Sequence, residues 1–186
     1  MSRVSLEVPF PDEVAQTVAA GFRDVPDFPQ PGVVFKDITP LLADAAALAS
    51  VTATLAGLAR HVGAEAVAGI EARGFMLAAP TAERAGVGFW PVRKAGKLPP
   101  PVLRRDYQLE YGTASLELST QAQYAGRRVL VVDDVLATGG TARAACELLE
   151  EAGAVVVGFV VLLELGFLNG RPQLGDRPVL ALHTQP

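Results

Sequence analysis

The chain has 186 residues, of which 50% are hydrophobic and 19% charged, and its formal net charge is -4. This composition is typical of a single folded domain with a substantial core and excludes a disordered chain. The acidic balance argues against broad binding to nucleic acid or to anionic membranes, so we expect neither as a partner.

The cysteine content and the apolar runs bear on the compartment. Cys146 is the only cysteine, which excludes an internal disulfide framework and favours a reducing environment. The first residues do not resemble a signal peptide, and the longest apolar run, Ala154 to Leu163, is about half of a membrane span. We therefore expect a cytoplasmic protein.

Helices and strands are predicted to alternate along the first half of the chain. Hydrophobic periodicity places helices at about 12–21, 45–61 and 75–85 and buried strands at 66–70 and 88–92. Later strands are predicted at 113–118, 129–132, 154–163 and 179–183, with a helix at 142–151. This order predicts an α/β fold, with a central, mostly parallel sheet flanked by helices.

Two stretches interrupt this order. Residues 26–40 are rich in proline, so they are held rigid and contain at most a short extended piece at 33–36. They could cover a ligand, form an interface or simply connect two elements. Residues 93–111 are basic and contain three consecutive prolines, and we expect a long loop here, either functional or disordered.

The strand predicted at 129–132 leads directly into polar residues. Asp133 and Asp134 follow it, and Thr138 to Thr141 form a Thr-Gly-Gly-Thr turn before the next helix. Converging N–H groups, two hydroxyls and a helix N-terminus make such a turn a cradle for phosphate, while paired carboxylates can accept hydrogen bonds from a sugar diol. A ribose 5-phosphate fits both. Alternatively, the glycines only shape a tight turn that the carboxylates cap.

Residues 131–141, Val-Val-Asp-Asp-Val-Leu-Ala-Thr-Gly-Gly-Thr, resemble the phosphoribosyl pyrophosphate motif of the type I phosphoribosyltransferase family. Three further segments, 28–40, 69–75 and 93–99 with 107–112, resemble the members of that family that use adenine. The resemblance implies one domain over residues 1–186 with the type I phosphoribosyltransferase fold. It also implies a small hood, formed by about 26–40 and the C-terminal part, and a flexible basic loop at about 93–111.

The resemblance also implies a role for each site residue and a homodimer. Asp133 and Asp134 would hold the ribose hydroxyls, with the 5-phosphate on Ala137, Thr138, Gly139, Gly140 and Thr141. The pyrophosphate would lie against Glu71, Ala72, Arg73, Gly74, Lys94 and Lys97, with the first peptide bond of Glu71–Gly74 often cis in the family. Val34, Phe35 and Lys36 would bind adenine, and Glu110 and Arg73 would be catalytic.

The chemistry of such a transfer fits these residues. Displacing pyrophosphate from an anomeric carbon passes through an oxocarbenium-like state, so the site must stabilise a highly charged leaving group and exclude water. Arg73, Lys94, Lys97 and a Mg²⁺ ion carried by the substrate suit the first need, and closure of the basic loop suits the second.

Two other functions remain open at this stage. The same chemistry could act on xanthine or guanine, because only the base pocket would differ. A non-catalytic, nucleotide-sensing regulator of the same fold is a second alternative, although the acidic balance and the lack of an added helix-turn-helix segment argue against it.

Overall fold

A computed structural model describes residue 6, residues 10–109 and residues 112–186. The helices are α1 (Asp12–Ala20), α2 (Thr39–Ala43), α3 (Ala45–His61), α4 (Arg73–Ala85) and α5 (Gly140–Glu151), with 3₁₀ turns η1 (Gly166–Leu168) and η2 (Arg171–Leu174). The strands are β1 (Arg23–Pro26), β2 (Val34–Asp37), β3 (Ala66–Ile70), β4 (Gly88–Lys94), β5 (Val102–Leu109), β6 (Gly112–Ser119), β7 (Arg128–Leu136), β8 (Val155–Leu165) and β9 (Val179–Gln185).

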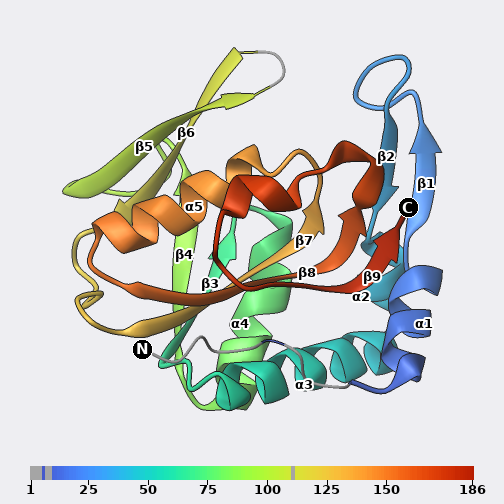
Figure 1. The fold of residues 1–186 in the computed structure, drawn as a ribbon, viewed down its shortest axis with the longest axis horizontal. Coiled ribbons are helices and arrows are strands. Elements are labelled where there is room, and N and C mark those ends of the chain that lie inside the picture. The colour runs from blue at the N-terminus through green and yellow to red at the C-terminus, as the bar shows by residue number, and fades with distance from the viewer. Residues whose placement is uncertain (1–5, 7–9, 110–111) are drawn as a thin grey trace.

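Seven strands form the central sheet in the order β5-β6-β4-β3-β7-β8-β9. From β4 to β9 all neighbours are parallel, whereas β6 is antiparallel to both β4 and β5. The predicted mostly parallel sheet is therefore confirmed. The β5–β6 hairpin extends beyond the parallel strands on one side of the molecule, and the separate β1–β2 pair stands on the opposite side (Figure 1).

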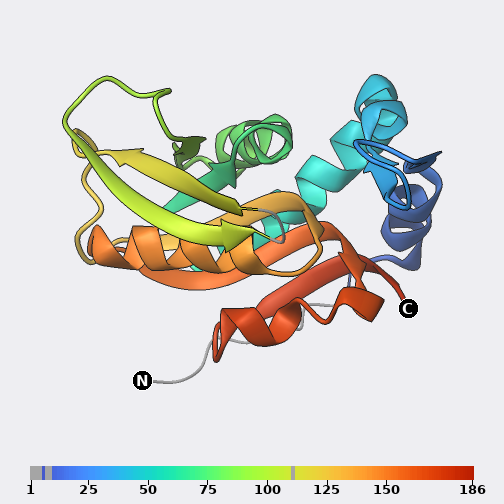
Figure 2. The same cartoon turned by 90° about the horizontal axis from the view of Figure 1, so that it is seen from above.

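Helices cover both faces of the sheet, with α5 on one face and α3 and α4 on the other (Figure 2). Alternation along the strands divides the core accordingly. Ala68 and Val131 pack with the buried residues of α5, whereas Val67 and Leu130 pack with α3 and α4. Burial on both faces explains why these strands are continuous apolar runs. Within the described ranges, no helix is long and apolar enough to cross a membrane.

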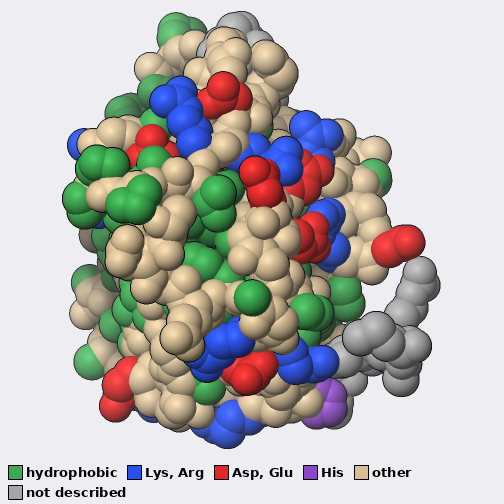
Figure 3. Space-filling model, turned by 90° about the vertical axis from the view of Figure 1, so that its left-hand side faces the viewer, with side chains coloured by type: hydrophobic (Ala, Val, Ile, Leu, Met, Phe, Trp, Pro, Cys, Tyr) green, Lys and Arg blue, Asp and Glu red, His purple; other side chains and the backbone are tan. Residues whose placement is uncertain are grey.

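The expectation of a loop throughout residues 93–111 is wrong for much of that segment. Residues 102–109 form β5, which pairs with β6 in register from Val102 opposite Ser119 to Leu109 opposite Gly112. The three prolines at 99–101 precede the strand and do not interrupt it. One of the basic residues, Arg105, is paired with α5, because its guanidinium lies 3.2 Å from Glu147 and 3.0 Å from Glu151. On the side of the molecule that lies at the left of Figure 1, charged side chains of both signs lie side by side (Figure 3).

Candidate active site

The site lies where β3 and β7 end. These strands are parallel neighbours, so the segment after β3 and the end of β7 meet at one edge of the sheet. Gly74, in the first turn of α4, makes this meeting close, because a Cβ there would lie 2.9 Å from both Asp133 Oδ1 and the Val132 carbonyl oxygen. A larger residue at position 74 would push the two segments apart.

Asp133 and Asp134 lie in the C-terminal half of strand β7, which runs further than the strand predicted from the sequence. The backbone N–H of Asp134 donates to Asp133 Oδ1 at 3.0 Å. Burial raises the pKa of both carboxyls, and for Asp133 the negative charge of Asp134 raises it further. Groups that donate hydrogen bonds to this pair would therefore relieve an unfavourable charge.

Arg73 supplies the positive charge closest to the pair. Its Nε lies 2.9 Å from Asp134 Oδ2, an oxygen that is buried and accepts no hydrogen bond within the described residues. The contact is thus an ion pair with poor hydrogen-bond alignment, and the carboxylate retains an acceptor for another donor.

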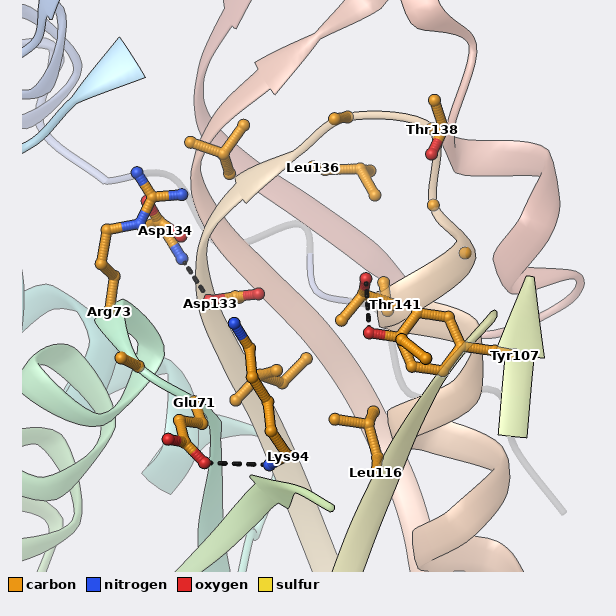
Figure 4. Close-up of a pocket in the computed structure, with 18 of the residues that line it drawn as sticks. Glu71, Arg73, Lys94, Tyr107, Leu116, Asp133, Asp134, Leu136, Thr138 and Thr141 are labelled. Atoms are coloured by element: carbon orange, nitrogen blue, oxygen red, sulfur yellow. Dashed lines mark hydrogen bonds and ion pairs between the residues drawn. The ribbon is translucent and has the colours of Figure 1, made fainter. Parts of the chain in front are cut away.

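The predicted phosphate loop, residues 137–141, connects β7 to α5. Gly139 has φ 85°, a left-handed conformation that favours glycine, and α5 begins at the next residue. The first N–H groups of α5 have no acceptor within the helix and are available to an anion. A cavity of about 510 Å³ lies here, and Figure 4 shows the acid pair, Thr138 and Thr141 around it.

In the segment Glu71–Gly74, the first three residues form another wall of this cavity, whereas Gly74 does not line it. The Glu71–Ala72 peptide bond is cis, as the family resemblance implied. Glu71 Oε2 accepts hydrogen bonds from Arg93 Nε at 3.0 Å and from the Lys94 backbone at 2.9 Å, and these lower the pKa of Glu71. The Lys94 side chain extends into the cavity (Figure 4), whereas Lys97 is exposed and does not line it.

A second, more open cavity of about 700 Å³ adjoins the first under the β1–β2 pair. The adenine-binding residues predicted from the sequence, Val34, Phe35 and Lys36, line it, together with Phe167, Leu168 and Gln185 from the C-terminal part. The Lys36 ammonium group is already paired at the cavity wall, because its Nζ donates to Asp24, which also lines this cavity, at 2.7 Å.

Arg73 connects the two cavities and lines both. Its Nη1 donates to the Lys36 carbonyl oxygen at 3.1 Å, and its guanidinium lies 4.8 Å from the centre of the Phe35 ring. Val135, Ala137 and Thr138 also line both cavities. A ligand with a phosphorylated sugar in the first cavity could therefore place an attached flat ring in the second.

Comparisons with known proteins agree with this geometry. Residues 39–176 match the model of the phosphoribosyl transferase domain. The chain is 78% identical over 180 residues to the adenine phosphoribosyltransferase of Kineococcus radiotolerans, an alignment that covers 97% of each chain. The chain belongs to the adenine phosphoribosyltransferase family.

Solved structures of adenine phosphoribosyltransferases share the fold. The enzyme from Thermoanaerobacter pseudethanolicus is 45% identical, with a TM-score of 0.88, and the match covers 92% of this chain and 99% of that one. The Saccharomyces cerevisiae enzyme, solved with adenine and an imino-altritol bisphosphate, is 36% identical with a TM-score of 0.86, and the match covers 92% and 99%.

Some residues of this adenine phosphoribosyltransferase site were not foreseen. Tyr107 lines the first cavity from β5, and Arg93 holds Glu71. A strand over Val102–Leu109 would place Arg105 and Tyr107 on the same face, because side chains two residues apart in a strand point the same way. That alternation is the sequence signal that pairs Tyr107 with the basic residue. The predicted catalytic residue Glu110 lies outside the described residues, so its role stays a prediction.

Cys146 is buried in α5, and burial raises the pKa of its thiol to about 12, as expected for a core residue and not for a nucleophile. Within the described part of the chain, no group of three or more His, Cys, Asp or Glu side chains could hold a metal ion.

Proposed function

We propose that the protein transfers the 5-phosphoribosyl group of phosphoribosyl pyrophosphate to adenine, giving AMP and pyrophosphate. The observation that carries this proposal is the pair of adjoining cavities that share Arg73. One contains an acid pair and a glycine-rich phosphate cradle, and the other is bounded by Val34, Phe35 and Phe167. The names of the relatives in other organisms favour adenine as the acceptor.

Each substrate group has a counterpart in the first cavity. The 5-phosphate would accept hydrogen bonds from residues 137–141, and the ribose hydroxyls would donate to Asp133 and Asp134, whose raised pKa values such donors would lower. Pyrophosphate would lie between Glu71–Gly74 and Lys94. Lys97 lies outside the cavity lining and would reach the pyrophosphate only if its loop moved inward.

Adenine would lie in the second cavity, next to Val34, Phe35 and the backbone of Lys36. An imidazole nitrogen of adenine attacks the anomeric carbon, and the bond to pyrophosphate breaks with its electron pair leaving on the pyrophosphate oxygen. The imidazole ring gives up its N–H proton as the new C–N bond forms, and Glu110 is the proposed acceptor of that proton. Arg73 stands at the boundary where the bond is exchanged, and its charge would offset the negative charge that develops on the leaving group.

The site fits a Mg²⁺ ion that is held mainly by substrate oxygens. Asp133 and Asp134 would face the water shell of an ion that the substrate carries, and the buried Asp134 Oδ2 accepts no hydrogen bond within the described residues. When bound, the ion would neutralise charge on the leaving pyrophosphate. Dependence of the initial rate on Mg²⁺, measured with EDTA as the control, tests this part.

Initial rates with phosphoribosyl pyrophosphate and either adenine, guanine or xanthine test the proposed acceptor. We expect adenine to give the highest kcat/KM. A clear preference for guanine or xanthine would contradict adenine but keep the reaction. Binding of phosphoribosyl pyrophosphate without any turnover, together with a shift of nucleic acid in a gel at physiological salt, would instead support a regulator.

We also expect a cytoplasmic homodimer. The lone buried cysteine suits a reducing compartment, and the family resemblance carries the dimer. Light scattering coupled to size-exclusion chromatography would distinguish a dimer from a monomer of 19.5 kDa.

A further inference from the structure

Tyr107 reaches the phosphate loop from the hairpin. It lies on β5, 8% exposed, and lines the first cavity. Its hydroxyl lies 3.4 Å from Thr141 Oγ1, and Figure 4 shows the two groups facing each other at one end of the cavity. Two residues earlier on the same face of β5, Arg105 forms ion pairs with Glu147 and Glu151 of α5. The strand is thus fastened to the helix that begins at the phosphate loop.

The backbone beside Tyr107 is equally close to that loop. A Cβ on Gly140 would lie 3.3 Å from the Gln108 carbonyl oxygen, a tighter contact than most Cβ atoms make. Hence the hairpin and the loop contact each other through backbone as well as through side chains.

The hydrogen-bond capacity of the two hydroxyls gives this contact a direction. Each hydroxyl can donate or accept a hydrogen bond, and Thr141 Oγ1 lies 3.4 Å from the Tyr107 oxygen. A phosphate oxygen only accepts, and a threonine hydroxyl carries a single hydrogen. When Thr141 turns this hydrogen to a phosphate, its oxygen is left as an acceptor for which the Tyr107 O–H is within reach.

We propose that Tyr107 is a positioning residue for the 5-phosphate: its O–H donates to Thr141 Oγ1 and so orients the Thr141 O–H at the phosphate. This inference rests on the proposed function, which places the 5-phosphate on residues 137–141. Chains of hydrogen bonds that polarise one another strengthen each member, so the tyrosine increases the affinity for the phosphate without touching it.

Calorimetry with AMP and with pyrophosphate tests the proposal on the full-length protein. Tyr107→Phe is expected to weaken AMP binding about fivefold, which corresponds to the net contribution of one ordinary hydrogen bond. Pyrophosphate binding should stay unchanged. Tyr124→Phe is the matched control, because Tyr124 is also buried and its hydroxyl donates to the Ser119 carbonyl at 2.8 Å, away from the cavity lining. It should change neither affinity.

A double-mutant cycle shows whether Tyr107 acts through Thr141. The loss caused by Tyr107→Phe should disappear when Thr141 is already Val and persist when Thr141 is Ser, which keeps the hydroxyl. A loss of the same size in the Val background, an equal loss for pyrophosphate, or no loss for AMP would each overturn the proposal while the proposed function stands. If the unaltered protein bound neither AMP nor pyrophosphate, the proposed function and this inference would both fall.

Discussion

Gly170 provides a sharp test of how precisely the phosphate loop is held. Its backbone, at φ -76° and ψ -25°, is one that any residue adopts, so Gly170→Ala carries no conformational penalty of its own. The added Cβ, however, would overlap the Ala137 carbonyl oxygen and lie 3.0 Å from the Gly139 nitrogen. Both are backbone atoms of the loop, so no side chain can rotate out of the way.

The overlap is relieved only if the loop or the segment carrying Gly170 moves by more than 1 Å, because the added Cβ would lie far inside the roughly 3.5–4.0 Å at which non-bonded heavy atoms pack. A displacement of that size in a catalytic site can lower the rate roughly 100-fold. We therefore expect Gly170→Ala to lower kcat/KM for phosphoribosyl pyrophosphate by about 100-fold, and to cost about 1–3 kcal/mol of stability through overpacking.

Steady-state rates at varied phosphoribosyl pyrophosphate, together with urea unfolding, measure both effects. Gly57→Ala is the control, since nothing lies within 4 Å of a Cβ at this position of α3. It should leave the rate unchanged and stabilise the protein by about 0.5–1 kcal/mol, because alanine is a better helix former than glycine. A Gly170→Ala enzyme with kcat/KM within about threefold of the unaltered protein would refute the reasoning.

Three further substitutions test the acid pair and the proposed base. Asp134→Asn should raise KM for phosphoribosyl pyrophosphate about tenfold, in initial-rate assays, because the ribose hydroxyls would then donate to a neutral amide and not to a charged carboxylate. Asp133→Asn should lower activity yet raise the melting temperature at pH 7. The raised pKa of Asp133 means that the native state binds more protons than the unfolded state above about pH 4, so its unfolding free energy falls as pH rises through that window. Glu110→Ala should lower kcat more than it weakens adenine binding by calorimetry.

Specific results would contradict these assignments. Near-normal rates for both Asp134→Asn and Glu110→Ala would remove the proposed ribose and base contacts together. For Asp133→Asn, thermal melts between pH 4 and pH 7 are decisive. If the variant were less stable than the unaltered protein at pH 7, the ionised carboxylate of Asp133 would be favourable in the native state, contrary to the expectation.

The sequence alone predicted the parts of the site that lie in continuous segments. The continuous apolar runs of β3 and β7 predicted a parallel sheet. Because the two strands are parallel neighbours, the polar residues that follow the apolar runs meet at one edge of the sheet. The β5–β6 hairpin was harder to predict from the sequence, because five basic residues and three prolines suggested a loop. The strand forms because β5 pairs with β6, and this tertiary contact outweighs the local preference. The ion pairs of Arg105 with α5 could not be predicted from a local sequence pattern either, because they too are tertiary contacts.

The phosphate loop shows why a motif can be recognised without its surroundings. The backbone of Gly170 packs against Ala137 and Gly139 from one direction, and the backbone of Gln108 lies beside Gly140 from another. These contacts involve main-chain atoms. They therefore limit the size of the side chain at the contacting positions but do not require a particular chemical group, and no sequence motif marks them. A chain that kept residues 131–141 intact but carried a side chain at position 170 would retain the phosphate-binding motif and lose the geometry on which phosphate binding depends.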